Sequence, residues 1–71
     1  MNKHEVARVK AAMQQFMCAA GSADRTSAGY LREWRILLER VAKVEESGRR
    51  RKARRWFQLL DSVRPSGVDG H

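Results

Sequence analysis

A run of cationic side chains is the part of this sequence with the clearest chemistry. Six of the seven residues from 49 to 55 are arginine or lysine, and they supply +6 of the net charge of +7, so the rest of the chain carries only +1. A guanidinium group can form paired hydrogen bonds with a phosphate or a carboxylate. The charge is therefore local, and we expect an anionic partner. The candidate binding residues are Arg49, Arg50, Arg51, Lys52, Arg54 and Arg55.

This cationic run opposes the helix in which it lies. If a helix starts near Arg49, its first turn is wholly cationic, and each exposed cation at the positive end of the helix dipole is unfavourable by about 0.3–1 kcal/mol. Arginines four residues apart repel one another as well. Glu45 and Glu46, acids elsewhere in the chain or on a second subunit, or an anionic partner could offset this cost. The density of the charge favours the anionic partner.

Nucleic acid is the leading hypothesis for that partner, because exposed arginines can contact phosphates and release their counterions. Two geometries are open at this stage. A three-helix unit could offer its third helix to a DNA groove, as in a helix-turn-helix, or a helical dimer could present two basic patches to an RNA or DNA backbone. We therefore expect a small regulatory protein, of bacterial or phage type, that binds nucleic acid through an arginine-rich helix.

A protein-interaction module is the alternative hypothesis. Basic residues followed by Trp56-Phe57 and Leu59-Leu60 are typical of a helix that binds an acidic surface or groove of another protein, as a phage or mobile-element inhibitor binds a host regulatory protein. Binding to a membrane surface is disfavoured, because the cations cluster at one end of the segment instead of lining a polar face. No stretch is long enough to span a bilayer, so we expect no membrane partner.

One tripeptide is similar to part of a known DNA-binding helix. Trp56-Phe57-Gln58 resembles a stretch of the third helix of homeodomains, where an asparagine that reads adenine follows. Leu59 occupies that place here, and the cationic residues precede the tripeptide instead of following it. We assign no family on this three-residue match.

We expect neither enzymatic activity nor a bound metal or cofactor. His4 and His71 lie near opposite ends of the chain, and neither has a cysteine or carboxylate at the spacing of a zinc site. No serine has Gly-x-Ser-x-Gly surroundings. The chain also lacks a glycine-rich loop that could cradle phosphate.

The periodicity of apolar residues predicts an all-α fold. Spacings of three and four recur over residues 3–20, 28–46 and 49–63, and no segment alternates as a strand would. These stripes predict a small bundle of amphipathic helices. The residues expected in the core or a dimer interface are Val9, Met13, Phe16, Trp34, Leu38, Val41, Trp56 and Leu60.

The number of helices depends on Gly48. Ser47-Gly48 is a plausible helix end, whereas Glu45 and Arg49 stand four residues apart in the order that favours one continuous helix. The apolar stripe of residues 28–46 would continue onto charged positions, which favours a break. Two long or three shorter helices are thus both open, and we favour three.

The length of 71 residues predicts one helical domain over residues 1–63 and a flexible tail over 64–71. A core of this size is marginal, so we expect a homodimer to complete it. Cys18 is the only cysteine, which excludes an internal disulfide and favours a reducing, cytoplasmic location. Its apolar neighbours indicate a buried thiol.

Overall fold

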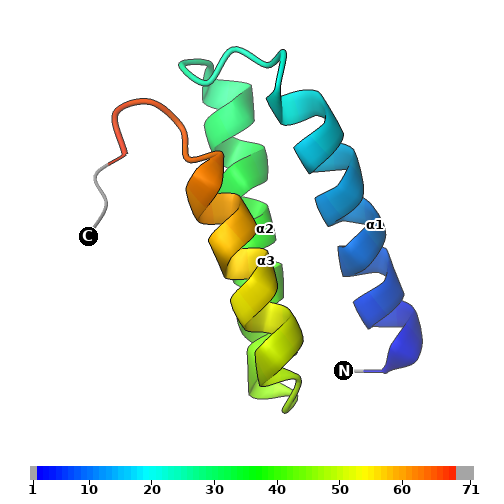
Figure 1. Ribbon diagram of the computed structural model, residues 1–71. Helices are drawn as coiled ribbons and strands as arrows, with labels where there is room; N and C mark the ends of the chain where they lie inside the picture. Colours follow the sequence, from blue (N-terminus) through cyan, green and yellow to red (C-terminus); the bar gives the residue numbers. More distant parts are fainter. Residues whose placement is uncertain (1, 69–71) are drawn as a thin grey trace.

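The computed structural model describes residues 2–68, and over this part the protein is all-helical, with three helices packed together and no strand. α1 spans Lys3–Ala20, α2 spans Ala28–Glu46 and α3 spans Arg50–Ser62. The all-α prediction is confirmed, with three helices in place of two long ones. α2 and α3 lie side by side and antiparallel, and α1 packs against this pair (Figure 1).

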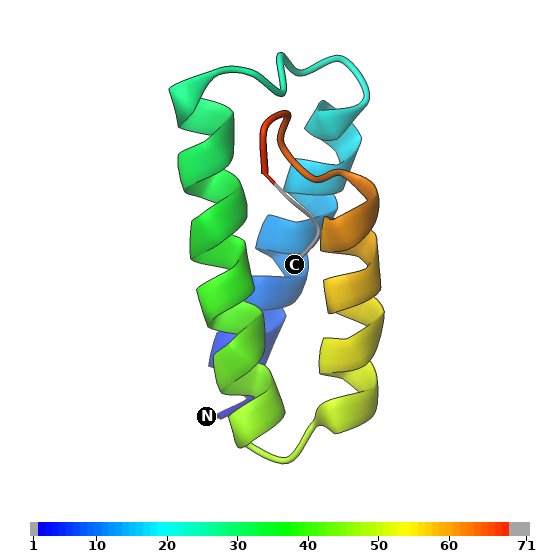
Figure 2. The ribbon, with the colours of Figure 1, turned by 90° about the vertical axis from the view of Figure 1, so that its left-hand side faces the viewer.

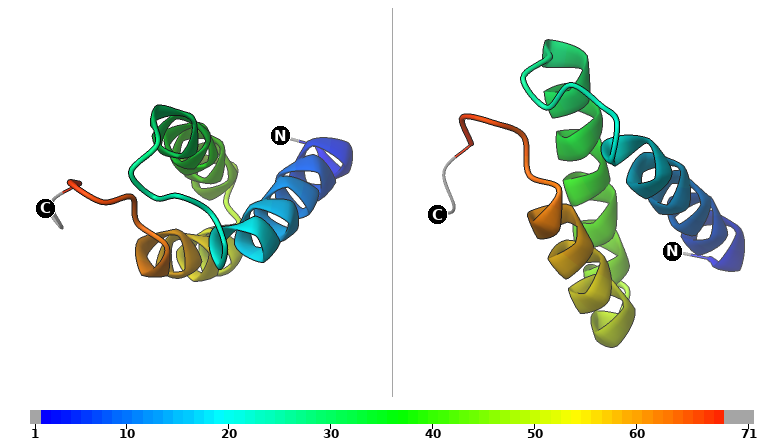
Figure 3. Two further views of the ribbon diagram at one scale, coloured as in Figure 1. Left: turned by 90° about the horizontal axis from the view of Figure 1, so that it is seen from above. Right: turned by 45° about the horizontal axis from the view of Figure 1, so that its top comes forward.

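α1 runs in the same direction as α3, so their N-terminal ends lie at the same end of the molecule (Figure 1). α1 also diverges from the α2–α3 pair toward its own N-terminus, as the view from above shows (Figure 3). The two helices that carry most of the lysines and arginines at this end are therefore neighbours whose axes diverge toward the N-terminus of α1.

Side-chain caps begin the first two helices but not the third. The Asn2 side chain accepts a hydrogen bond from the backbone N–H of Glu5 at 2.9 Å, and Ser27 accepts one from Tyr30 at 3.1 Å. Such caps satisfy backbone donors that a helix start leaves free. Arg49 occupies the same position in α3 and makes no capping hydrogen bond through its side chain. The backbone N–H groups in the first turn of α3 therefore have no side-chain cap.

Gly48 ends α2 and turns the chain into α3. Its φ of +99° lies in the left-handed region, where a residue without a Cβ has no steric penalty. The N–H of Gly48 donates to the carbonyl of Glu45 at 3.0 Å, and the N–H of Arg49 donates to that of Val44 at 3.3 Å. These two bonds form the Schellman motif that terminates helices, and they account for the break at this glycine.

The core lies where the apolar stripes of the three helices meet. Six of the eight positions expected in the core or an interface are buried, and Phe16 and Leu38 are half-buried and pack against them. Among residues 2–68, Leu59 is the one exposed large hydrophobic residue, with 37% of its surface exposed. The six buried positions are Val9, Met13, Trp34, Val41, Trp56 and Leu60.

Two aromatic side chains of α2 bind the C-terminal end of α3. The Trp34 indole Nε1–H donates to the carbonyl of Leu60 at 2.8 Å, and the Tyr30 hydroxyl donates to the carbonyl of Val63. The Leu60 carbonyl also accepts the backbone N–H of Val63 at 3.3 Å, so the indole gives it a second hydrogen bond, and the two aromatic side chains tie the end of α3 to α2. The Tyr30 ring also lies 5.0 Å from that of Phe16 on α1, which links all three helices.

The segment after α3 folds back over the helices (Figure 2). Pro65 is buried, and the backbone N–H of Ser66 donates to the carbonyl of Arg25 at 3.1 Å. Val68 packs against the core. Residues 64–68 of the stretch expected to be a tail thus make defined contacts, and residues 69–71 lie outside the described part of the chain.

Cys18 corrects one expectation. Its thiol is exposed, because position 18 faces away from the stripe formed by Val6, Val9 and Met13 on α1. Between residues 2 and 68, no helix is long and apolar enough to cross a bilayer.

Candidate functional site

A groove between α1 and α3 gathers most of the cations near the Gly48 turn. One hollow is lined by side chains of Lys10 and the first half of α3, and a second is lined by the start of α1 together with Arg49 and Lys52. Lys10 and Lys52 line both hollows, so the two adjoin. We call this the cationic groove. Its lining residues are Lys3, Val6, Ala7, Lys10, Arg49, Arg51, Lys52, Arg55 and Trp56.

Each wall of the cationic groove follows from helical spacing. Lys3 and Lys10 are seven residues apart, which is about two turns, so they share one face of α1. Arg51 and Arg55 are four residues apart and share a face of α3. The packing of α1 beside α3 brings these two faces together. Lys3 and Lys10 were not predicted as binding residues from the sequence, where the only signal for them was their common face on the first helix.

No ion pair within residues 2–68 neutralises the charge of the cationic groove. Six of its nine lining residues are cationic and none is acidic. The one ion pair among the described residues joins Arg64 to Asp61, near the opposite end of α3. Glu45 and Glu46 form no ion pair with the cationic run in residues 2–68, so the acids nearest in sequence do not offset its repulsion by direct contact.

Trp56 belongs to the base of the cationic groove. Its side chain is buried, with 6% of its surface exposed. The Lys52 ammonium lies 5.9 Å from the centre of the indole ring, a distance at which a cation is attracted to the ring face. Trp56 is thus a core residue whose ring positions Lys52, and its burial leaves little surface for stacking on a base.

The cationic run divides between two flanks of α3. Arg49, Arg51, Lys52 and Arg55 line the cationic groove, whereas Arg54 lines a second groove, between α2 and α3. Arg50 is exposed and lines neither of them. The six candidate binding residues therefore do not form one surface. Four of them, joined by two lysines of α1, form one site.

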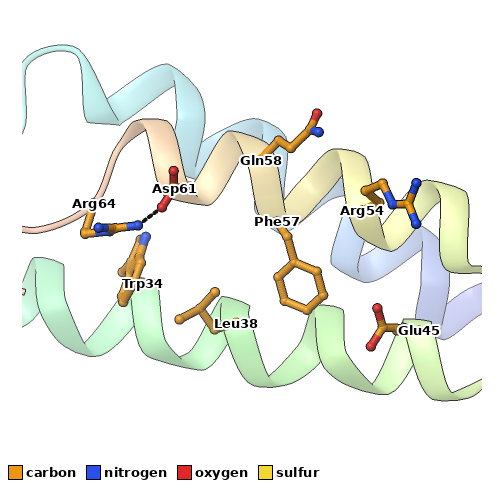
Figure 4. A pocket seen from close by; sticks show the side chains of 8 residues that line it. All are labelled: Trp34, Leu38, Glu45, Arg54, Phe57, Gln58, Asp61 and Arg64. Carbon is orange, nitrogen blue, oxygen red and sulfur yellow. Dashed lines mark ion pairs between the residues drawn. The ribbon is translucent and has the colours of Figure 1, made fainter. Parts of the chain in front are cut away.

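The second groove has a different character. This α2–α3 groove encloses about 480 Å³, and Leu38 and Phe57 point toward one another across it (Figure 4). Arg54 faces Glu45 at one end, and the Asp61–Arg64 ion pair closes the other. Acids and bases balance along its rim, so it lacks the excess of positive charge found in the cationic groove. The residues that line it are Trp34, Leu38, Glu45, Arg54, Phe57, Gln58, Asp61 and Arg64.

The arrangement of α2 and α3 bears on the first of the two geometries considered above. The two helices of a helix-turn-helix cross at roughly 90–120°, whereas α2 and α3 lie antiparallel along most of their length (Figures 1 and 2). The described fold therefore does not present α3 in helix-turn-helix form. Comparisons of the chain with protein-family models, with curated proteins and with solved structures find no match.

Proposed function

We propose that this chain is a small basic regulatory protein that binds nucleic acid, with the cationic groove, including the four cations that the start of α3 contributes to it, as its binding surface. The observation that carries the proposal is the convergence of six cations from two helices on one groove that no acid lines. Gathering like charges is unfavourable unless an anion binds there. A phosphodiester backbone supplies the anions, and arginine suits their geometry.

The proposed activity is binding, not catalysis. Contacts between arginine or lysine and phosphate release counterions from the nucleic acid, so the affinity should fall as the salt concentration rises. Because such contacts carry no information about base identity, we propose binding with little or modest sequence specificity.

Fluorescence anisotropy with labelled DNA and RNA, at low and near-physiological salt, tests this proposal. The informative variant is Arg51→Gln with Arg55→Gln, which removes two charges from the cationic groove. Its matched control is Arg50→Gln with Arg54→Gln, which removes two charges from the same helix outside that groove. We expect the first variant to weaken binding by about tenfold or more, equivalent to about 1.4 kcal/mol, and the control to weaken it much less. Absent binding at near-physiological salt would contradict the proposal.

The α2–α3 groove favours a second candidate function, a protein-interaction module that binds an acidic surface or groove of a partner protein. Leu38 and Phe57 are half-buried in that groove, and Leu59 is exposed nearby on α3. Pull-down with wild-type protein and with Phe57→Ala separates the two candidates. A partner that depends on Phe57 but not on Arg51 would favour the interaction module.

We also propose that the chain forms a homodimer and acts in the cytoplasm. A core built from 71 residues is marginal by itself, and a second copy of the chain would complete it. The exposed thiol of Cys18 suits a reducing compartment. Sedimentation equilibrium should give twice the chain mass of 8.2 kDa, whereas a single-chain mass at all concentrations would contradict the dimer.

A further inference from the structure

The cationic groove has charge on two walls and apolar side chains between them. Lys3 and Lys10 stand on the α1 wall, and Arg51 and Arg55 stand on the α3 wall. Between these walls Ala7 is exposed, whereas Val6 and Trp56 are each only 6% exposed. Most of the accessible apolar surface therefore belongs to the methylene stems of the lysine and arginine side chains. A ligand that uses the whole site must therefore lie between two helices and offer both negative charge and apolar surface.

A nucleic-acid duplex meets these requirements poorly. The major groove of B-DNA is about 12 Å wide and admits one α-helix, and each helix with its side chains is about 10–12 Å across. Two adjacent helices cannot enter it together. A duplex lying over the molecule would touch the rims of the cationic groove, and its stacked bases would offer no free face to the arginine and lysine side chains of the two walls.

A single strand meets them well. Proteins that bind single strands combine a positive groove that follows the backbone with surfaces that contact the exposed faces of the bases. The two charged walls can hold phosphates from either side, while arginine guanidinium groups of the α3 wall can stack on the exposed faces of the bases. The separation of seven residues between Lys3 and Lys10 corresponds to about 10 Å along the helix, so the bound stretch is a few nucleotides long.

We propose that the cationic groove binds a single strand of RNA or DNA in preference to a duplex. This inference rests on the function proposed above and specifies the class of ligand. Nonspecific electrostatic attraction would instead favour the duplex, because a duplex carries phosphates at twice the density of one strand. A preference for the single strand would therefore indicate a site whose shape fits a single strand.

The experiment compares a labelled oligonucleotide of about ten nucleotides, within the usual range of single-strand sites, with its own duplex at near-physiological salt. RNA and DNA strands of one sequence are both used, and they show which sugar the groove accepts. We expect the single strand to bind about tenfold tighter than the duplex. Equal or tighter binding of the duplex would overturn the inference while leaving nucleic-acid binding intact. Absence of binding to every probe would overturn both.

A variant of the α1 wall tests whether that wall takes part. Lys3→Gln with Lys10→Gln removes two exposed charges from α1, and the Arg50→Gln with Arg54→Gln variant removes two charges outside the cationic groove. Glutamine is a good helix former, and circular dichroism checks that both variants fold. We expect the α1 variant to lose about tenfold in single-strand affinity and the control less than about twofold. Equal losses, or equally tight binding of a polyglutamate peptide, would overturn the inference.

Discussion

The indole N–H of Trp34 on α2 donates a hydrogen bond to the backbone carbonyl of Leu60 on α3, at 2.8 Å. Both residues are buried. The bond joins the middle of one helix to the last turn of the other, where the Leu60 carbonyl also accepts the backbone N–H of Val63 at 3.3 Å. It therefore fixes α3 along the length of α2, and the position of the arginine-rich first turn relative to α1 depends on it.

Replacing Trp34 with phenylalanine should lower stability measurably. The variant keeps an aromatic ring but loses the hydrogen bond and part of the packed volume, for a cost of about 1–3 kcal/mol. For a domain of this size each kcal/mol lowers Tm by about 4–8 °C, so thermal unfolding followed by circular dichroism will resolve the change. Leu59→Ala, at an exposed position of α3, is the control and should change Tm little. Equal shifts in the two variants would contradict the assigned role of Trp34.

Two glycines should respond to alanine with opposite signs. Gly48 has a φ of +99°, and Gly29 lies in the first turn of α2 with a helical conformation. A Cβ at either position would meet no atom within 4 Å, so only the backbone differs. Gly48→Ala should destabilise the protein by about 1–2 kcal/mol, whereas Gly29→Ala should stabilise it by up to about 1 kcal/mol. Chemical denaturation of both variants measures this difference, and stabilisation by Gly48→Ala would refute the left-handed turn.

Asp24 should titrate below its ordinary pKa. The hydroxyl of Thr26, and then its backbone N–H at 2.9 Å, donate hydrogen bonds to the Asp24 carboxylate and lower its pKa below the usual 3.8. Because the pKa is lower in the folded state, the stabilisation is present above about pH 4 and is lost as the pH falls through the folded pKa. Thr26→Val should raise the pKa toward 3.8, while the backbone bond keeps part of the shift. NMR titration of the Asp24 carboxyl measures it, and an unchanged pKa in the variant would contradict the hydroxyl's role.

The helices follow from local sequence, and this explains why the all-α class and the three segments could be predicted. The spacing of apolar residues, the capping residue Asn2 and the helix stop at Gly48 are all properties of a few neighbouring positions. The third segment was predicted over residues 49–63, and α3 spans Arg50–Ser62 because Arg49 and Val63 are its cap positions. The predicted burial of the Cys18 thiol was wrong, because its apolar neighbours in the sequence do not share its face of the helix.

The cationic groove depends on tertiary structure and could be predicted only in part. The α3 cations are evident as a run in the sequence. Lys3 and Lys10 join them only because α1 lies beside α3 and runs in the same direction. The flank on which each cation lies follows from the burial of Ala53, Trp56 and Leu60, which sets the rotation of α3. This rotation separates Arg51 and Arg55 from Arg54, a division that a run of like charges does not reveal by itself.

The salt dependence of binding distinguishes a site in the cationic groove from attraction to total charge, because its slope counts the phosphates that the protein neutralises. The measurement is log K against log salt concentration for a single-stranded oligonucleotide, with wild type, the Arg51→Gln/Arg55→Gln variant and the Arg50→Gln/Arg54→Gln control. Each lost phosphate contact reduces the slope by about 0.7 for a single strand. If the cationic groove is the binding site, the slope falls by about 1.4 in the first variant and stays near that of the wild type in the control. Equal reductions in the two variants would show that binding reflects total charge, and would contradict a site in the cationic groove.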